Sequence, residues 1–212
     1  MKILLGIFLS YLLGSIPIAF LFARIYRGID IRKHGSGNVG ATNVFRVLGK
    51  WPGIFVLLCD ITKGLIATTL FCEMLDLPYI FQRIMLGLAV VSGHNWTIFL
   101  KFKGGKGIAT SLGVLIGFAI EYSFLRIVLA ICTLVWGLTF LLSGYVSLAS
   151  MASACFLPLV MVLTNQAIEL IILGVIFCIF VMLRHQGNIK RLLSGTESRI
   201  FTPFKGKKKY LF

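Results

Sequence analysis

Long apolar segments separated by short polar ones make up most of this chain. Crossing the hydrocarbon core of a bilayer takes about 20 apolar residues in a helix, and most of the segments approach that length. The pattern therefore predicts an all-α integral membrane protein, formed as one domain over residues 1–212. We expect seven transmembrane helices, at residues 3–23, 51–71, 79–100, 108–120, 127–142, 146–163 and 168–183.

The basic residues between these segments predict the orientation of the chain. On this topology 17 lysines and arginines lie on one side and 3 on the other, while Lys63 lies within the membrane. Basic residues near membrane ends stay preferentially in the cytoplasm. The amino terminus is therefore expected outside, and the carboxyl terminus, with a basic tail at 184–212, in the cytoplasm. This arrangement suits a multi-pass membrane protein with its basic side in the cytoplasm.

Composition narrows the function further. Hydrophobic residues make up 58% of the chain, too many for a protein folded around one water-surrounded core. A net charge of +14 would suggest nucleic acid as the partner of a soluble protein. Beside apolar helices it indicates attraction to anionic membrane lipid instead, so we expect no nucleic-acid partner. We also expect no obligate protein partner. The five cysteines have no metal-like or bridging spacing, which predicts reduced thiols and no metal site.

The first polar motif is H-G-S-G-N-V-G-A-T-N, residues 34–43. Its glycine spacing matches the dinucleotide fingerprint, but transmembrane helices flank it instead of a strand and a helix, which excludes that fold. Glycines still allow close backbone approach to an anion, and an arginine adds a forked charge. A plain glycine-rich loop is the alternative. The candidate anion ligands are Ser36, Gly37, Asn38, Thr42, Asn43 and Arg46.

The second motif, K-F-K-G-G-K-G at residues 101–107, precedes an expected helix start. Unpaired amides at a helix start bind anions, and lysines reinforce them. The motif lacks the order of a Walker loop, which disfavours ATP hydrolysis. A basic loop that only fixes topology is the alternative. The candidate ligands here are Lys103, Gly104, Gly105 and Lys106.

The third motif, at residues 184–191, follows the last apolar segment. His185 and Asn188 are three residues apart, so they share a helix face if the helix continues. Glu197 is the only acid in the tail. A histidine at a helix exit is often a passive interfacial residue, but two other polar loops on the same side favour a functional role.

Four further polar residues lie within or beside the expected spans. Asp60 and Lys63 are three residues apart in one span, where pairing would neutralise both charges; lining a cavity is the alternative. His94 is expected just below the membrane surface near the lysines, either as a structural residue or in the site. Ser147, at a short turn between two spans, could complete the site together with Ser143.

The chain resembles the bacterial acyl-phosphate:glycerol-3-phosphate acyltransferases, the PlsY family of small seven-span inner-membrane enzymes. The resemblance covers nearly the whole chain. Its signatures occur in order, as S-I-P (15–17), G-S-G-N-V-G-A-T-N (35–43), D-x-x-K-G (60–64), G-H-N-W-T-I-F-L-K-F-K-G-G-K-G-I-A-T (93–110), V-S-L-A-S (146–150) and R-H-Q-G-N-I-K-R-L-L-S-G-T-E (184–197).

The resemblance implies transfer of a fatty acyl group from acyl phosphate to the 1-hydroxyl of glycerol 3-phosphate, which gives lysophosphatidic acid without any cofactor. It implies phosphate handling by the first motif, glycerol-phosphate binding by the second, and a structural role for Glu197. The expected catalytic residues are Ser36, Lys106, His185 and Asn188. Either a substrate phosphate oxygen or His185 accepts the hydroxyl proton.

Two other classes of protein fit less well. A transporter or scramblase would use the same cationic motifs, but it needs a site near mid-membrane with access from both faces, whereas the polar residues crowd one face. A phosphoalcohol transferase needs an acid-rich metal signature. The expected cytoplasmic loops contain only Asp30 and Glu197, so this signature is missing.

Overall fold

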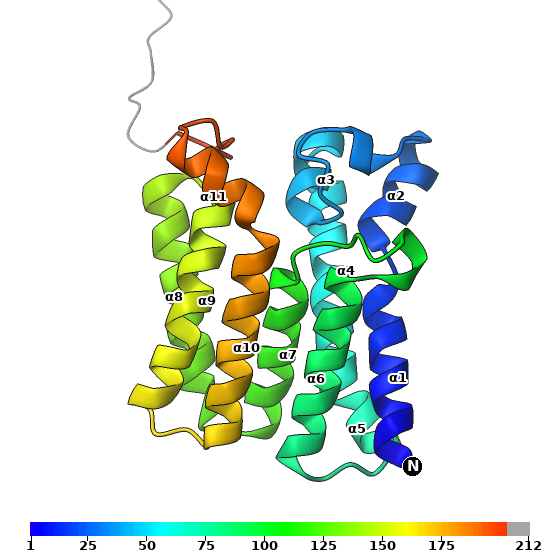
Figure 1. Ribbon diagram of the computed structural model, residues 1–212, viewed down its shortest axis with the longest axis vertical. Coiled ribbons are helices and arrows are strands. Elements are labelled where there is room, and N and C mark those ends of the chain that lie inside the picture. Colours follow the sequence, from blue (N-terminus) through cyan, green and yellow to red (C-terminus); the bar gives the residue numbers. More distant parts are fainter. Residues whose placement is uncertain (203–212) are drawn as a thin grey trace, which may run out of the picture.

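Helices form all the regular structure of residues 1–202, the part of the chain that the computed structural model describes (Figure 1). The α-helices are α1 (Lys2–Ser15), α2 (Ile18–Arg27), α3 (Ala41–Leu48), α4 (Lys50–Thr68), α5 (Leu70–Met74), α6 (Ile80–Asn95), α7 (Ile108–Glu121), α8 (Leu125–Ser143), α9 (Val146–Leu163), α10 (Ile168–Arg184) and α11 (Gln186–Leu193). The 3-10 helices η1 (Ile31–Lys33) and η2 (Ile98–Leu100) lie in connections. The all-α prediction is confirmed for these residues. The end of the expected basic tail, residues 203–212, lies outside them.

Helix length identifies fewer membrane spans than the seven expected. Within residues 1–202, four helical stretches are long and apolar enough to cross a membrane: Lys2–Arg27, Lys50–Met74, Leu125–Ser143 and Val146–Leu163. The pair α10 and α11, bent by 61°, is a fifth candidate. α7 is apolar but has only 14 residues, and α6 ends at Asn95 instead of continuing to residue 100. The seven-span count and the orientation therefore stay predictions.

The first expected span, residues 3–23, is divided into α1 and α2 by a break at Ile16 and Pro17. Proline has no N–H to donate, so helical hydrogen bonds are lost near it. Two distant side chains replace them, because Thr97 donates its hydroxyl to the Ser15 carbonyl and Lys63 donates its ammonium to the Ile16 carbonyl. A broken helix is tolerated in a membrane where neighbouring groups satisfy the freed backbone in this way.

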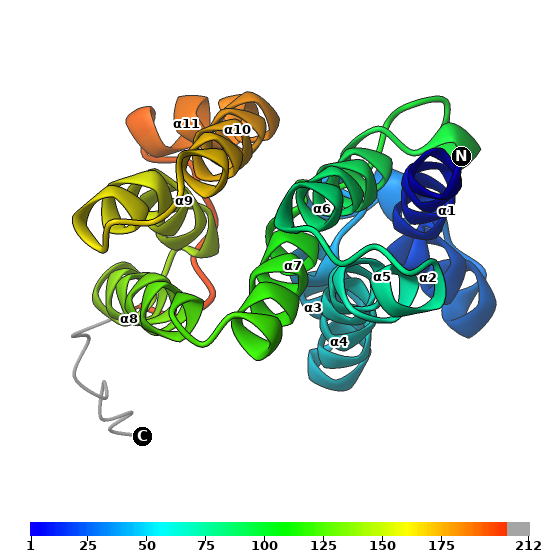
Figure 2. The ribbon, with the colours of Figure 1, turned by 90° about the horizontal axis from the view of Figure 1, so that it is seen from below.

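The helices form two groups, which we call the first half (residues 1–121, α1–α7) and the second half (residues 125–202, α8–α11 and the segment after them) (Figure 2). The chain passes from one to the other through residues 122–124, between α7 and α8. A buried apolar cluster contains side chains of both halves, among them Val114, Phe118 and Leu173. Trp96 of the first half also meets Phe180 of the second edge-on, with ring centroids 5.0 Å apart. The halves are therefore packed together as well as connected.

α4 and α7 form one wall of the first half through close backbone contact. A Cβ added to Gly64 of α4 would collide with the carbonyl oxygen of Thr110, and one added to Gly113 of α7 would collide with the carbonyl oxygen of Ile61. Small residues allow membrane helices to approach closely in this manner.

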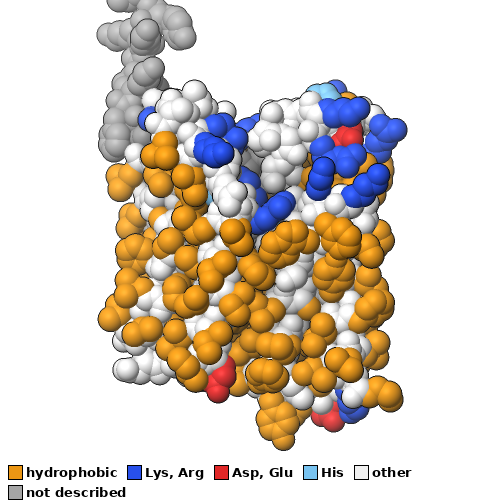
Figure 3. Space-filling model, in the orientation of Figure 1, with side chains coloured by type: hydrophobic (Ala, Val, Ile, Leu, Met, Phe, Trp, Pro, Cys, Tyr) orange, Lys and Arg blue, Asp and Glu red, His pale blue; other side chains and the backbone are white. Residues whose placement is uncertain are grey.

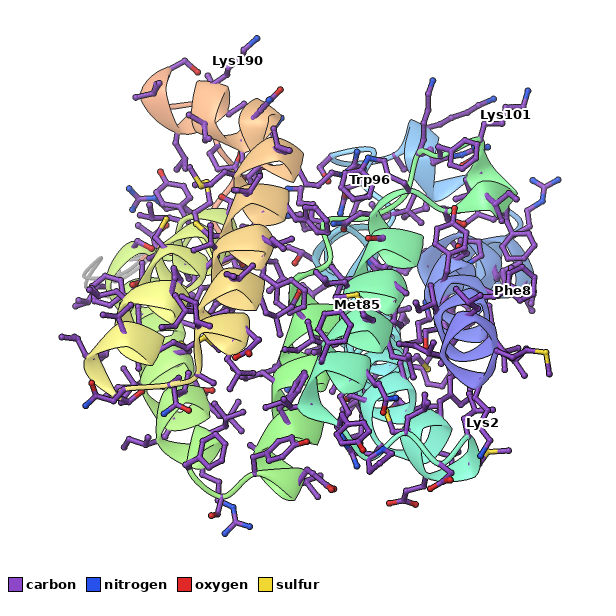
Figure 4. All side chains as sticks on the ribbon, turned by 60° about the horizontal axis from the view of Figure 1, so that its bottom comes forward. Lys2, Phe8, Met85, Trp96, Lys101 and Lys190 are labelled. Carbon is purple, nitrogen blue, oxygen red and sulfur yellow. The ribbon has the colours of Figure 1, made fainter. Side chains whose placement is uncertain are left out.

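Lysine and arginine side chains gather at one end of the molecule, above a band of hydrophobic side chains (Figure 3). We call this the basic end. In Figure 4 the labelled Lys101 and Lys190 lie at this end on the first and second halves, while Lys2 lies at the opposite end. The opposite end carries the exposed ion pair of Lys2 with Asp76, 3.2 Å long.

Candidate active site

A cavity of about 600 Å³ lies between the two halves and extends from the basic end into the apolar interior. Its walls are contributed by α3, α4, α6 and α7 of the first half and by α8, α9, α10 and α11 of the second. Polar residues line the basic end: Ser36, Asn38, Thr42, Asn43, Arg46, Asp60, His94, Lys106, Ser147, His185, Asn188 and Glu197. Apolar residues line the deep part: Phe118, Leu125, Leu157, Met161, Leu170, Leu173 and Phe177.

The cavity brings together most of the residues expected from the three polar motifs. Ser36, Lys106 and Asn188 come from three separate segments and share its wall, together with His185. Of the expected site residues, Gly37, Lys63, Lys103, Gly104 and Gly105 are not part of that wall.

Asn43 holds the first motif in shape. Its side chain is buried, and its Nδ2 donates to the carbonyls of Ile31, His34 and Asn38, at 3.3, 3.0 and 3.1 Å. Its Oδ1 accepts the backbone N–H of Ser36 at 2.8 Å. Because protein groups occupy both ends of the amide, Asn43 orders the loop, and this loop directs Ser36 to the cavity. We expected a direct substrate contact from Asn43, which its hydrogen bonds do not support.

The two glycines of the second motif also have their backbone groups occupied. The N–H of Gly104 donates to the Asn95 carbonyl at 3.2 Å, and the N–H of Gly105 donates to the His94 carbonyl at 3.0 Å. Arg184 donates to both glycine carbonyls, from Nη2 to Gly104 at 2.8 Å and from Nε to Gly105 at 2.9 Å. These glycines therefore hold the loop and leave no free amide for an anion. Lys103 is exposed beside them.

Lys106 begins a chain of hydrogen bonds that crosses the cavity. Its ammonium donates to Oδ1 of Asn188, and Nδ2 of Asn188 donates to Oε1 of Glu197 at 2.7 Å. The pKa of Lys106 is lowered to about 8, chiefly by burial and also by nearby arginines, against the opposing effect of Glu197. Lys106 is therefore a cation at neutral pH that exchanges its proton more readily than an ordinary lysine.

Glu197 accepts three side-chain donors. Besides Asn188, these are the hydroxyl of Ser147 at 2.9 Å and Nε of Arg191 at 2.7 Å. Burial raises the pKa of this carboxyl, but hydrogen bonds from Arg191, Asn188 and Ser147 outweigh burial, and the net pKa is lowered. The carboxylate therefore stays ionised and fixes Asn188 and Ser147 in the cavity wall.

His185 presents one ring nitrogen to the protein. With Nδ1 protonated, it donates to the Val181 carbonyl at 2.8 Å, which leaves Nε2 as an acceptor. Burial and, secondarily, the charge of Lys106 lower the pKa of His185 to about 4. The imidazole is therefore neutral at physiological pH and would be a weak general base.

Arg46 of α3 supplies a second cation to the cavity. Its Nη2 donates to the carbonyl of Ser198 at 2.8 Å, while its buried Nε has no hydrogen-bond partner among residues 1–202. Burial lowers the pKa of this guanidinium, although an arginine remains charged. An unpaired buried donor is suited to receive a ligand oxygen.

Asp60, Lys63 and His94 form a buried cluster between the cavity and the α1–α2 break. Oδ1 of Asp60 lies 2.9 Å from Nζ of Lys63 and 3.6 Å from Nδ1 of His94. Both alternatives for Asp60 and Lys63, mutual pairing and lining a cavity, thus have support, because Asp60 is paired with Lys63 and also lines the cavity.

Arg184 and Thr97 are the residues that sequence reasoning missed. Each acts on backbone carbonyls of a segment far away in the sequence, so nothing local indicates the contact. The sequence feature that could have indicated Arg184 is its place at the end of an apolar segment, beside His185, where a charged side chain needs a partner.

A cationic cavity end joined to a deep apolar end, in a bundle of membrane-type helices, indicates a membrane protein whose cavity suits an amphiphile with an anionic head group. Within residues 1–202, no group of three or more His, Cys, Asp or Glu residues could hold a metal ion.

Comparisons with known proteins agree with this class. A family model described as glycerol-3-phosphate acyltransferase matches residues 4–195. A glycerol-3-phosphate acyltransferase of Desulforamulus reducens is 44% identical, covering 90% of this chain and 92% of its own. One of Geotalea daltonii is 46% identical, covering 89% and 93%. The chain belongs to the glycerol-3-phosphate acyltransferase family.

Solved structures agree as well. The integral membrane glycerol 3-phosphate acyltransferase PlsY, in its glycerol 3-phosphate form, superposes with a TM-score of 0.85 at 38% identity, covering 95% of this chain and 97% of that one. Its lysophosphatidic acid form gives a TM-score of 0.82 at 37% identity, with the same coverage. This chain is therefore a helical membrane acyltransferase that uses glycerol 3-phosphate.

Proposed function

We propose that this protein transfers a fatty acyl group from acyl phosphate to the 1-hydroxyl of glycerol 3-phosphate, giving lysophosphatidic acid and inorganic phosphate. The single observation that carries the proposal is the continuous cavity, cationic at the basic end and apolar beyond it. Such a cavity suits a donor with a phosphate head and a long apolar tail together with a small phosphorylated acceptor.

In this proposal the phosphate oxygens of the two substrates contact Ser36, Arg46 and Lys106, three donors of the first half that line the cavity. Asn38, Thr42, Ser147 and Asn188 are further polar donors in the same wall. Acyl phosphate is an activated mixed anhydride, so the protein needs to supply mainly positioning and charge stabilisation. Lys103, Gly37, Gly104 and Gly105 act through the loops that they form.

The reaction balances without a cofactor. The 1-hydroxyl oxygen of glycerol 3-phosphate attacks the acyl carbon, the carbon–oxygen bond of the anhydride breaks, and inorganic phosphate leaves. The hydroxyl proton goes to a phosphate oxygen of a substrate. The pKa of His185, about 4, favours this acceptor over the imidazole. Lys106 and Asn188 stabilise the charge that develops on the oxygen atoms.

The decisive assay gives the purified protein palmitoyl phosphate and labelled glycerol 3-phosphate, without metal or nucleotide. Lysophosphatidate is the expected product. A transporter or scramblase would instead move labelled solute or lipid across vesicle membranes and form no ester. Uptake without product would overturn the proposal.

The proton acceptor is tested by a matched pair of variants. His185→Asn keeps a donor at the position of Nδ1, which contacts Val181, and His185→Gln keeps a polar group at the position of Nε2. If a substrate phosphate accepts the proton, at least one variant retains substantial turnover with the pH profile of the wild type, since the accepting group, whose second pKa is about 6, belongs to the substrate. If both variants lose turnover while still binding glycerol 3-phosphate, His185 is the base.

We also propose that the basic end faces the cytoplasm of a bacterial inner membrane. The gathering of lysine and arginine at this end supports the assignment (Figure 3). A cysteine introduced at exposed Lys190 should react with a membrane-impermeant maleimide in inside-out vesicles but not in intact spheroplasts. The reverse result would invert the orientation.

A further inference from the structure

Three side chains at the basic end join the two halves across the mouth of the cavity, within residues 1–202. Lys106 of the first half donates to Asn188 of the second. Arg46 of the first half donates to the Ser198 carbonyl of the second, at 2.8 Å. Arg184 of the second half donates to the carbonyls of Gly104 and Gly105 of the first.

These bridges differ in whether a substrate can compete for them. Arg46 and Lys106 both line the cavity, and a phosphate there would offer each cation a stronger, charged acceptor than a carbonyl or amide oxygen. Arg184 and its two glycine acceptors are not part of the cavity wall. The Arg184 bridge is therefore the one that persists while substrate phosphate displaces the other two.

Arg184 and the end of α6 hold the loop at Gly104 and Gly105 through different backbone groups. The carbonyls at the end of α6 accept the N–H groups of Gly104 and Gly105, and the planar fork of Arg184 takes the carbonyls of the same two residues. Lys106 follows directly in the sequence, and His185 follows Arg184. The contact thus fixes a segment next to a cavity cation against a segment next to a cavity imidazole.

We infer that Arg184 is a positioning residue that keeps Lys106 of the first half aligned with His185 and Asn188 of the second during the reaction. The inference rests on the proposed function for its kinetic consequences. It assigns to Arg184 no contact with substrate, because its guanidinium is engaged outside the cavity wall.

The kinetic test compares Arg184→Gln and Arg184→Lys with Arg24→Gln. Arg24 is a matched control because it donates to a single carbonyl, that of Gly28, on the exposed surface of the first half. A misplacement of about 1 Å costs about 100-fold in rate, so R184Q should lose about 100-fold in kcat with a smaller change in KM for glycerol 3-phosphate. R184K can reach one carbonyl at a time and should fall between R184Q and the wild type.

Chemical rescue separates positioning from folding. Arg184→Ala leaves space for a free guanidinium ion, which can span the two carbonyls, so added guanidinium should raise the kcat of R184A and leave that of R24Q unchanged. Turnover of R184Q equal to that of R24Q would overturn the inference. Loss of turnover that matches a loss of folded protein in all three Arg184 variants, without rescue, would overturn it as well.

A readout independent of activity uses spin labels on the two halves. Cysteines replace the exposed residues Phe99 and Lys190 in a background in which the five natural cysteines are replaced by alanine. R184Q should broaden the distance distribution between the labels, whereas R24Q should not. Identical distributions would contradict the inference. This result stands even if the wild type makes no lysophosphatidate, an outcome that would count against the proposed function alone.

Discussion

Glu197 links side chains from three parts of the chain. It accepts hydrogen bonds from Ser147 of α9 and from Asn188 and Arg191 of α11, and Asn188 in turn accepts the ammonium of Lys106. An amide held between a cation and a carboxylate has a fixed orientation, with its oxygen toward the cation. Glu197 therefore determines which atom of Asn188 faces the cavity.

Replacing Glu197 with glutamine should disturb this arrangement, although the size is unchanged. The new NH2 group must face either Arg191 or the pair Ser147 and Asn188, and neither the guanidinium of Arg191 nor the NH2 of Asn188 can accept a hydrogen bond. We expect a loss of about 1–3 kcal/mol in unfolding free energy and of about 100-fold in kcat. Thermal unfolding in detergent and the acyltransferase assay measure these losses. Glu169→Gln, at an exposed position in the first turn of α10, should change neither.

Lys106 should give the reaction an alkaline limit. Its pKa is lowered to about 8, so its ammonium is present below that pH and is lost above it. The kcat/KM for glycerol 3-phosphate, which reports the free enzyme, should therefore fall as pH rises through about 8. The alkaline fall in kcat should occur at a higher pH, because a bound phosphate favours the charged form of Lys106 and so raises its pKa.

The variant Lys106→Arg tests the origin of this limit. Its guanidinium does not titrate in the accessible range, so whatever turnover remains should show no alkaline fall near pH 8. An unchanged fall in K106R would assign the limit to another group.

Close contact between the helices α4 and α7 sets the shape of one wall of the cavity. A methyl group added at Gly113 meets the backbone of α4, which cannot rotate away, so Gly113→Ala should separate the helices. Overpacking of this kind costs about 1–3 kcal/mol. Thermal unfolding should show this loss, and kcat should fall with it, since residues of both helices line the cavity.

Gly137→Ala is the matched control. Gly137 is in α8, and nothing lies within 4 Å of the position of its added Cβ. Alanine there should leave stability unchanged or raise it by up to about 1 kcal/mol through helix propensity. If both variants behave alike, close approach of α4 and α7 is not what Gly113 provides.

Hydropathy predicted the elements well where helix boundaries depend on local sequence. The expected segments 108–120, 127–142, 146–163 and 168–183 correspond to α7, α8, α9 and α10 within a few residues. It missed the breaks near Pro17 and after Thr68. A break at Pro17 is stable because Lys63 and Thr97, from other elements, satisfy the freed carbonyls, and a window along the chain does not contain those partners.

The polar motifs predicted the cavity end better than they predicted individual roles. Ser36, Lys106 and Asn188 were identifiable because intramembrane polar residues are costly and gather around sites. Asn43 and the pair Gly104 and Gly105 have donor and acceptor groups in the right region, but the fold uses those groups internally. Whether a polar group is free depends on tertiary contacts, which composition does not reveal.

The two halves of the molecule contribute different polar groups to the cavity. The first half contributes the cavity cations Arg46 and Lys106, and the second contributes His185, Asn188 and Glu197. The apolar depth belongs to both, since α7 lies on one side and α8, α9 and α10 on the other. Neither half alone encloses the cavity, so in the proposed reaction the relative position of the halves would set both substrate binding and chemistry.

The depth of the shared cavity should limit the length of the acyl chain. Cavity-lining residues on α9 extend from Val146 to Met161, which corresponds to about 22 Å of helix. Leu157 lies about 15 Å below Ser147 on the same helix, so Leu157→Trp should fill the deep part and leave the mouth open. We expect kcat/KM to fall at least about tenfold for long-chain acyl phosphates, since each excluded CH2 forfeits about 0.8 kcal/mol, while short-chain donors keep their wild-type values.

Leu159→Trp, at a residue that is 49% exposed on the outer face of α9, should affect neither class of donor. Equal losses for short and long donors in L157W would place the acyl chain elsewhere.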